Sequence, residues 1–125
     1  MIVSDSAAGY DQTAARLIDA IARRGLTVFA RVDHAAGARA AGLDLAPEEV
    51  VIFGNPQAGT PLMQGDPRIG YELPLRILIW QQGQRVLLGY RDPRELADQY
   101  DVIELMPILD RMASLLAEVV AEAAS

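Results

Sequence analysis

The sequence predicts an α+β domain in which an antiparallel β-sheet carries its helices on one face, in the order β-α-β(4)-α. Two observations predict this fold. Apolar residues alternate with polar ones through much of the middle of the chain, as in strands, and recur at helical spacing near both ends. The resulting order of strand, helix, several strands and helix is typical of an antiparallel sheet with its helices gathered on one side.

The first third of the chain reads as a strand, a helix and a second strand. Residues 2–4 form a short strand. Asp11 is a suitable N-cap for the helix that follows, and Gly25, just after two arginines, is a suitable end for it. Residues 26–33 then alternate cleanly, which predicts a strand.

The next segments read as a short helix, a buried strand and a long connection. An alanine-rich helix is expected over residues 34–41 and a strand over residues 50–53. Residues 54–70 are dense in glycine and proline, so we expect mostly loop there. A short acidic helix opens at Pro93, and the last helix begins near Pro107 with an apolar stripe that can cover the sheet.

A β-hairpin is predicted from residues 73–80 and 85–90, turning at Gln82-Gly83. If the turn has two residues, Trp80 lies opposite Arg85. One face of the hairpin is then a core face, and the other is a mixture of apolar and basic residues. The core face consists of Leu75, Ile77, Ile79, Val86, Leu88 and Tyr90.

Composition excludes several classes of function. The 125 residues suit a single domain that can bury one core without staples. There is no cysteine, which excludes disulfides, zinc-thiolate sites and cysteine nucleophiles. The net charge of -6 argues against nucleic-acid binding, which needs a basic surface. No stretch is long and apolar enough to span a membrane, and no signal peptide is present, so we expect a cytoplasmic protein without a membrane partner.

One segment and four shorter motifs resemble a known family. The run Ile52–Met63, IFGNPQAGTPLM, is similar to the signature segment of the domain of unknown function 302 family. The other matching pieces, in order, are Tyr10…Thr13…Leu17, Val32–Ala36, Leu73–Arg76 with Trp80, and Tyr90–Pro93. The resemblance covers nearly the whole chain.

The resemblance implies a fold similar to the TATA-box-binding-protein-like fold, with the order β-α-β-β-β-β-α. It implies no activity, because the family is named for lacking one. Family members often have Asn before the Asp-Pro pair, whereas this chain has Arg91 there. A polar contact assigned to that position in the family therefore does not carry over.

The loop from Gly54 to Met63 is the leading candidate for a ligand site. Thr60 is a good N-cap and Pro61 a good first-turn residue, so we expect a short helix to begin at Leu62. The free N–H groups at such a helix start favour a small anion. The alternative is a rigid crossover whose polar residues cap only their own backbone. The candidate ligand-binding residues are His34, Gly54, Asn55, Gly59, Thr60, Tyr90 and Asp92.

His34 is the only histidine, so a histidine-based metal cluster is not expected. Its position at a strand end beside Asp33 would suit a general base with a carboxylate that orients it. Adjacent strand residues point to opposite faces, however, so a histidine at a helix start bonded to backbone is the alternative. Asp92 is expected to cap the helix that starts at Pro93.

The mixed face of the sheet is a candidate interface. Aromatic residues and arginines that lie together are typical of the centres of protein interfaces. Arg31 is expected on this face too. The candidate interface residues are Phe29, Arg76, Leu78, Trp80, Arg85 and Leu87.

Two classes of function remain open. The favoured one is a non-enzymatic domain that binds a small anionic molecule near Gly54–Thr60 and forms a homodimer through its sheet. The other is an enzyme that uses His34 as general base with Asn55, Thr60 and Tyr90. The sequence identifies neither a cofactor nor a catalytic residue, since no nucleotide-binding, Walker or EF-hand spacing is present.

Overall fold

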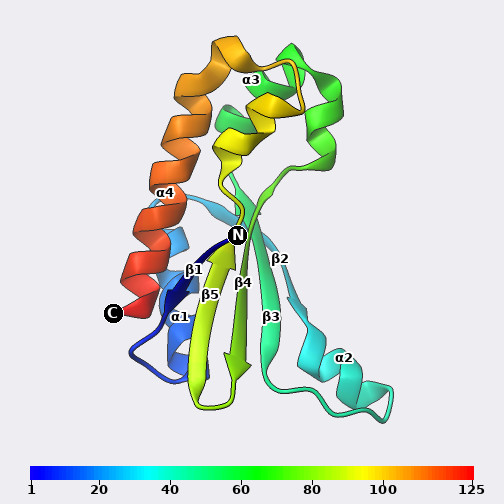
Figure 1. The fold of residues 1–125 in the computed structure, drawn as a ribbon, viewed down its shortest axis with the longest axis vertical. Coiled ribbons are helices and arrows are strands. Elements are labelled where there is room, and N and C mark those ends of the chain that lie inside the picture. Colours follow the sequence, from blue (N-terminus) through cyan, green and yellow to red (C-terminus); the bar gives the residue numbers. More distant parts are fainter.

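The computed structural model of the protein describes residues 1–125 and has the predicted α+β fold. A single five-stranded sheet, antiparallel throughout, has the strand order β1-β5-β4-β3-β2 (Figure 1). The strands are β1 (Ile2–Asp5), β2 (Thr27–Asp33), β3 (Glu48–Gly54), β4 (Leu75–Gln82) and β5 (Arg85–Tyr90). The α-helices are α1 (Tyr10–Arg23), α2 (His34–Ala40), α3 (Pro56–Gly65) and α4 (Met106–Ala124).

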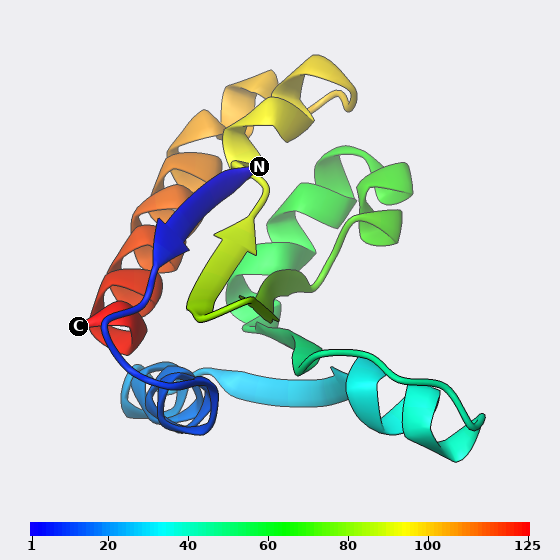
Figure 2. The ribbon, with the colours of Figure 1, turned by 60° about the horizontal axis from the view of Figure 1, so that its bottom comes forward.

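Helices α1 and α4 pack side by side against one face of the sheet (Figures 1 and 2). Between them and the sheet lies a core of 15 buried residues. Ile77 and Ile79 of β4 and Leu88 of β5 are fully buried there, which confirms the predicted core face of the hairpin. The other face of the sheet carries no helix, and α2 projects away beyond the end of β2 (Figure 2).

A second, smaller core lies beyond the end of the sheet. Its six buried residues come from α3, from the N-terminal half of α4, from the first two of three 3₁₀ helices and from Val102, which precedes the third. These short helices are η1 (Pro67–Tyr71), η2 (Pro93–Asp98) and η3 (Ile103–Leu105). Leu75, at the start of β4, packs against both cores. None of the helices combines the length and the apolar character needed to cross a membrane.

The hairpin register differs from the predicted one by two residues. Gln82 pairs with Arg85, and Trp80 lies opposite Leu87 rather than Arg85. The turn is therefore at Gly83, whose positive φ of 63° suits glycine. A shift of two residues leaves every side chain on its original face, so the predicted faces hold although the turn was misplaced.

A β-bulge in β2 moves the residues that follow it, Arg31 among them, to the faces opposite those predicted. The pairing of β2 with β3 slips between Val28 and Ala30, with Phe29 as the extra residue. Arg31 consequently pairs with Val51, which points into the core, so Arg31 is not on the open face as predicted. Its guanidinium instead forms two hydrogen bonds of 2.9 and 3.1 Å to the buried carboxylate of Glu49.

Helix α1 begins one residue before the predicted cap. Gly9 is its N-cap residue and makes no side-chain cap bond, while Asp11 lies in the first turn. An acidic residue in the first turn still favours the helix start through the helix dipole. Asp92 is confirmed as the cap of η2, where its carboxylate accepts a hydrogen bond from the Arg94 amide.

Truncation of Ile77 should test the assignment of the two faces. Ile77 is fully buried between the sheet and the helices, so Ile77→Ala should lower the free energy of unfolding by about 2–5 kcal/mol. Val32, on the open face and 41% exposed, provides the control, and Val32→Ala should cost less than about 1 kcal/mol. Urea denaturation measures both. Equal losses for the two variants would contradict the assignment.

Candidate functional site

A pocket of about 330 Å³ lies where the two cores meet. Its walls come from α3, α4, the bulge of β2, the end of β3 and the segment entering β4. Residues that pack on the larger core, such as Leu26 and Leu115, face residues that pack on the smaller one, such as Leu73 and Ile108. The pocket is thus a cavity at the boundary between the two cores.

The lining of the pocket is mostly apolar and has one charged group. Among the 16 lining residues only Arg111 of α4 is ionised, and Asn55 and Thr60 are the other polar side chains. Arg111 is exposed and has no carboxylate within ion-pair distance. Seven of the eleven arginines form ion pairs, and Arg111 is the one without a pair that lines this pocket.

The predicted loop is largely a helix, and this helix forms one wall. Helix α3 runs from Pro56 to Gly65, so the expectation of a helix that begins at Leu62 was wrong. Asn55 caps α3 and Pro56 occupies its first turn. This is the same combination of a capping residue and a proline that Thr60-Pro61 presents, but it lies five residues earlier in the chain. Pro61 lies inside the helix.

The N–H groups at the start of α3 are not free to hold an anion. The Gln57 amide donates to the side-chain oxygen of Asn55 at 2.9 Å. The amides of Ala58 and Gly59 donate to the backbone carbonyl of Asn55 at 3.0 and 3.2 Å, and Pro56 has no N–H. Because each donor of the first turn has an internal partner, the predicted backbone anion site at this helix start does not form.

The structure gathers part of the predicted ligand set and separates the rest. Gly54, Asn55, Gly59 and Thr60 line the pocket together with the candidate interface residue Phe29. His34, Tyr90 and Asp92 do not.

His34 lies at the opposite end of the sheet from the pocket. The pairing of β2 with β3 places Gly54 opposite Thr27 and places Asp33 opposite Glu49. Six residues of strand at about 3.3 Å each therefore separate the two ends by about 20 Å. The Asp33 carboxylate accepts a hydrogen bond from the Ala36 amide and so caps α2 instead of orienting His34. An active site that combines His34 with Asn55 and Thr60 is thus not formed.

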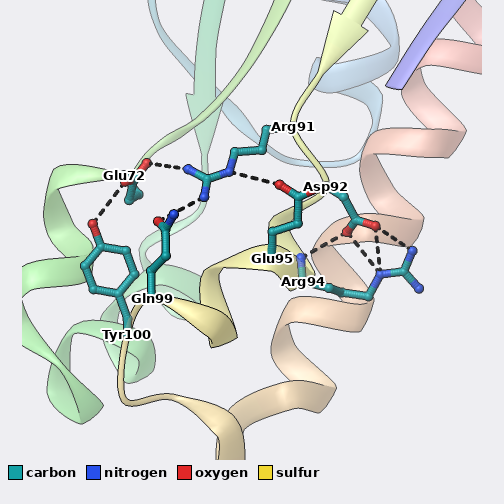
Figure 3. Close-up of polar contacts among 7 residues, drawn as sticks. All are labelled: Glu72, Arg91, Asp92, Arg94, Glu95, Gln99 and Tyr100. Atoms are coloured by element: carbon teal, nitrogen blue, oxygen red, sulfur yellow. Dashed lines mark hydrogen bonds and ion pairs between the residues drawn. The ribbon is translucent and has the colours of Figure 1, made fainter. Parts of the chain in front are cut away.

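Tyr90 and Asp92 belong to the structural framework. Tyr90 is buried in the larger core, where burial, and secondarily the charge of Asp92, raises the pKa of its phenol. Asp92 forms a 2.7 Å ion pair with Arg94, and these hydrogen bonds lower the pKa of Asp92 (Figure 3). Tyr90 is therefore part of the packed core, and the Asp92 carboxylate is engaged at the start of η2.

Arg91, which stands where family members often have Asn, joins three segments (Figure 3). Its guanidinium bonds to Glu72 at 3.2 Å, to Glu95 at 3.3 Å and to Gln99 at 3.0 Å. The Tyr100 hydroxyl donates to the same Glu72 carboxylate at 3.0 Å. This network connects the segment that follows β5 to the segment that precedes β4.

Asp66 is a structural residue that the sequence analysis missed. It is buried between α3 and η1 and accepts hydrogen bonds from the Arg68 guanidinium, the Arg68 amide and the Asp101 amide. These bonds, the Arg68 guanidinium foremost, hold the pKa of Asp66 far below its ordinary value. The Asp66-Pro67 pair could have indicated the cap, but not the contact with Asp101.

The wall contributed by α4 was also missed. Ile108, Arg111, Met112 and Leu115 line the pocket from one side of α4. Ile108, Arg111 and Leu115 recur at spacings of three and four residues, beside the stripe that enters the cores, to which Met112 also belongs. This second row of residues on α4 was the feature of the sequence that could have indicated the pocket wall.

Comparison with known proteins identifies the family. The profile of the family described as Domain of unknown function DUF302 matches residues 2–123. The chain belongs to this family. The crystal structure of an uncharacterized conserved DUF302 protein from Bacillus stearothermophilus matches with a TM-score of 0.88 over 98% of this chain and 96% of that one. At 21% sequence identity this likeness establishes the DUF302 fold alone.

Curated relatives are longer proteins. The protein named fluoride-specific ion channel FluC 1 of Brucella suis biovar 1 (strain 1330) is 43% identical over 103 residues, which are 82% of this chain and 41% of the relative. Fluoride-specific ion channel FluC 1 of Brucella abortus biovar 1 (strain 9-941) has the same identity, and the match covers 38% of it. The DUF302 chain thus spans about two fifths of the length of the curated relatives it matches.

Neutralising Asp66 should weaken the fold in a pH-dependent way. Its folded pKa lies below the ordinary value of 3.8, so its stabilising effect is fully present above that value and is lost as pH falls below it. Asp66→Asn should therefore lower the free energy of unfolding at neutral pH, and the difference from wild type should shrink toward about pH 3. Urea titrations at several pH values measure it.

The control for this prediction is Asp44→Asn. Asp44 is exposed and makes no side-chain hydrogen bond, so this variant should match wild type at every pH. A difference between Asp66→Asn and wild type that stays constant with pH would show that the carboxylate charge is not what stabilises the fold.

Proposed function

We propose that this DUF302 chain is a non-enzymatic domain that binds a small amphipathic molecule with an anionic head group in the pocket between α3 and α4. The observation that carries the proposal is an apolar pocket whose one charged lining group, Arg111, has no partner in the chain. A few polar groups on otherwise apolar walls are typical of sites for small organic ligands.

The apolar walls favour a ligand with a hydrocarbon part. Leu26, Met63, Leu73, Ile108 and Leu115 surround the space, and burying a ligand's methylene groups there contributes about 0.8 kcal/mol each. The volume of about 330 Å³ is near the lower end of small-molecule pockets. A short chain or a single ring system suits that size better than a larger ligand.

Arg111 favours an anionic head group on such a ligand. Its guanidinium has several N–H donors that match a carboxylate or phosphate in a bidentate arrangement. Because Arg111 is exposed at the edge of the pocket, a charged head group there would stay in contact with water. The ligand could therefore bury its apolar part without desolvating its charge completely.

An enzyme is the less favoured reading. The residues required for it, His34 with Asn55, Thr60 and Tyr90, lie in different parts of the fold. Asn55 uses its side-chain oxygen to cap α3. No nucleophile and base lie together in the pocket, which supports binding over catalysis.

Fluoride is a second candidate ligand, suggested by the name of the Brucella relatives. A small, strongly hydrated anion needs several donors to replace its water. The pocket walls are mostly apolar, and the amides at the start of α3 already have partners. The amphipathic ligand is therefore favoured, and fluoride serves as a separate arm of the test.

Filling the pocket should abolish ligand binding. Gly59 lines the pocket, and a Cβ atom there would lie at an ordinary contact distance of 3.6 Å from the Leu73 side chain, so the side chain of Gly59→Leu should occupy pocket space. Sodium decanoate should bind to wild type in isothermal titration calorimetry and should not bind detectably to this variant. Sodium fluoride, titrated in parallel, should give no heat.

The matched control is Gly37→Leu, which places the same side chain in open space on helix α2. This variant should bind decanoate as wild type does. Wild type that binds neither decanoate nor any co-purified molecule detected by native mass spectrometry would contradict the proposed function, and a saturable response to fluoride alone would favour the second candidate.

Removing the charge at the edge of the pocket should weaken binding of an anion selectively. Arg111→Gln should weaken decanoate binding by about threefold to tenfold at low salt, since an exposed charge pair contributes modestly. Binding of decanol, which lacks the charge, should not change. Arg39→Gln on α2, another unpaired exposed arginine, is the control. An equal loss for decanoate and decanol would show that Arg111 acts through packing.

A further inference from the structure

The face of the sheet opposite α1 and α4 is broad, apolar and uncovered (Figure 2). The strand pairing places Val50, Ile52, Leu78 and Trp80 on it, at the middle of the sheet. Val3 and Val32, on the two outer strands, are 46% and 41% exposed on the same face. A contiguous apolar surface of this kind commonly marks an interaction site.

Trp80 leans over the neighbouring strand β5 and is only half-buried. It is paired with the candidate interface residue Leu87, which is buried, and a Cβ atom at Gly89 would lie 3.1 Å from Cζ3 of the indole and closer still to the Met1 side chain. The absence of that atom lets the ring lie over the neighbouring strand. Trp80 is half-buried within the chain, so its outer surface is still in water.

The charges on this face divide into paired and unpaired groups. Arg85 forms hydrogen bonds of 2.8 and 3.0 Å to Asp5 at the edge of the sheet, so it needs no further partner. Arg76 and Glu48 have no ion-pair partner within the chain. One unpaired positive group and one unpaired negative group therefore remain.

These two groups are arranged symmetrically about the centre of the face. Arg76 is paired with Ile52, and Glu48 is paired with Trp80. The Val50–Leu78 pair lies midway between them, two residues from each. At about 3.3 Å per residue the two charges are about 13 Å apart along the strands, which is too far for them to pair within one chain.

We propose that this face binds a second copy of the chain, with a two-fold axis that lies in the interface and passes beside the Val50–Leu78 pair. A rotation about that axis exchanges the positions of Arg76 and Glu48. Each Arg76 then faces Glu48 of the second copy, so one operation forms two identical ion pairs. Sheets that stack face to face are about 10 Å apart, a gap that an arginine and a glutamate pointing toward each other can bridge.

A second copy accounts for the charge pattern better than another partner does. An isologous interface requires a surface that is complementary to itself, with each charge matched by its opposite across the axis. The apolar centre, with Trp80 beside it, would supply most of the affinity, and the two ion pairs would set the register. A different protein would not require this symmetry on the face of the present chain.

The first experiment is sedimentation of the wild-type protein over a range of concentrations. A reversible dimer is expected, and Trp80→Glu should be monomeric with an unchanged far-ultraviolet circular dichroism spectrum. A wild-type protein that is a clean monomer at high micromolar concentration would overturn the proposal, whatever the ligand pocket binds. Decanoate binding is measured separately, so the two proposals can fail independently.

The second experiment reverses the charges of Arg76, which is exposed, and Glu48, which is half-buried. Arg76→Glu alone and Glu48→Arg alone each place like charges across the axis, and each should weaken dimerisation about tenfold or more. The double variant Arg76→Glu/Glu48→Arg restores opposite charges and should return the dissociation constant to within about threefold of wild type. Additive losses in the double variant would exclude the proposed axis.

Matched controls keep the net charge equal. Arg39→Glu on α2 and Glu104→Arg on η3 make the same charge changes at exposed residues away from the sheet, and neither residue forms an ion pair in the chain. Both should dimerise as wild type does. Weakening by these controls equal to that of the face variants would mean that overall charge, rather than the proposed pairing, controls association.

Discussion

The apolar side of α4 is the feature on which the rest of the structure depends. Its C-terminal half contributes Leu116, Val119 and Val120 to the core beneath the sheet. Its N-terminal half contributes Leu109 and Met112 to the core beyond the sheet. No other helix supplies buried residues to both, so the position of α4 fixes the smaller core relative to the strands.

The pocket is a consequence of this arrangement. Protein interiors normally close to near-crystalline density, so two adjacent apolar cores would be expected to merge. Here α4 and Leu75 contribute to both cores. The hydrogen bonds of Arg91 and of the buried Asp66 carboxylate connect the segments that surround the smaller core. An unfilled apolar space between well-packed regions is a local departure from good packing, which natural proteins tend to concentrate at functional sites.

The sequence predicted the fold and the faces of the sheet because those depend on local periodicity. The hairpin turn was misplaced, yet a register shift of two residues preserved which side chains are buried. The bulge at Phe29 was not readable, because a single extra residue leaves the alternating pattern of the strand intact while turning Arg31 to the other face. The start of α3 was misjudged because two cap-and-proline pairs compete, and Asn55-Pro56 comes first.

The candidate site was only half predictable for a related reason. Gly54, Asn55, Gly59 and Thr60 lie on one continuous segment whose unusual composition draws attention. The opposite wall, with Arg111, comes from a helix about fifty positions later in the chain, and only the tertiary packing of α4 brings it across from α3. Contacts such as Asp66 with Asp101 likewise depend on chain folding that no local pattern encodes.

The bulge in β2 has a consequence for communication across the molecule. It turns Phe29 so that the ring lines the pocket while 52% of the residue is exposed at the border of the open sheet face. A molecule in the pocket would contact this ring, and a protein surface against the sheet would approach its exposed part. If a ligand in the pocket changes the free energy of binding at the sheet face, then binding at the sheet face must change the free energy of ligand binding by the same amount. The single inserted residue in β2 thus provides a side chain through which binding at the sheet face and binding in the pocket would be linked.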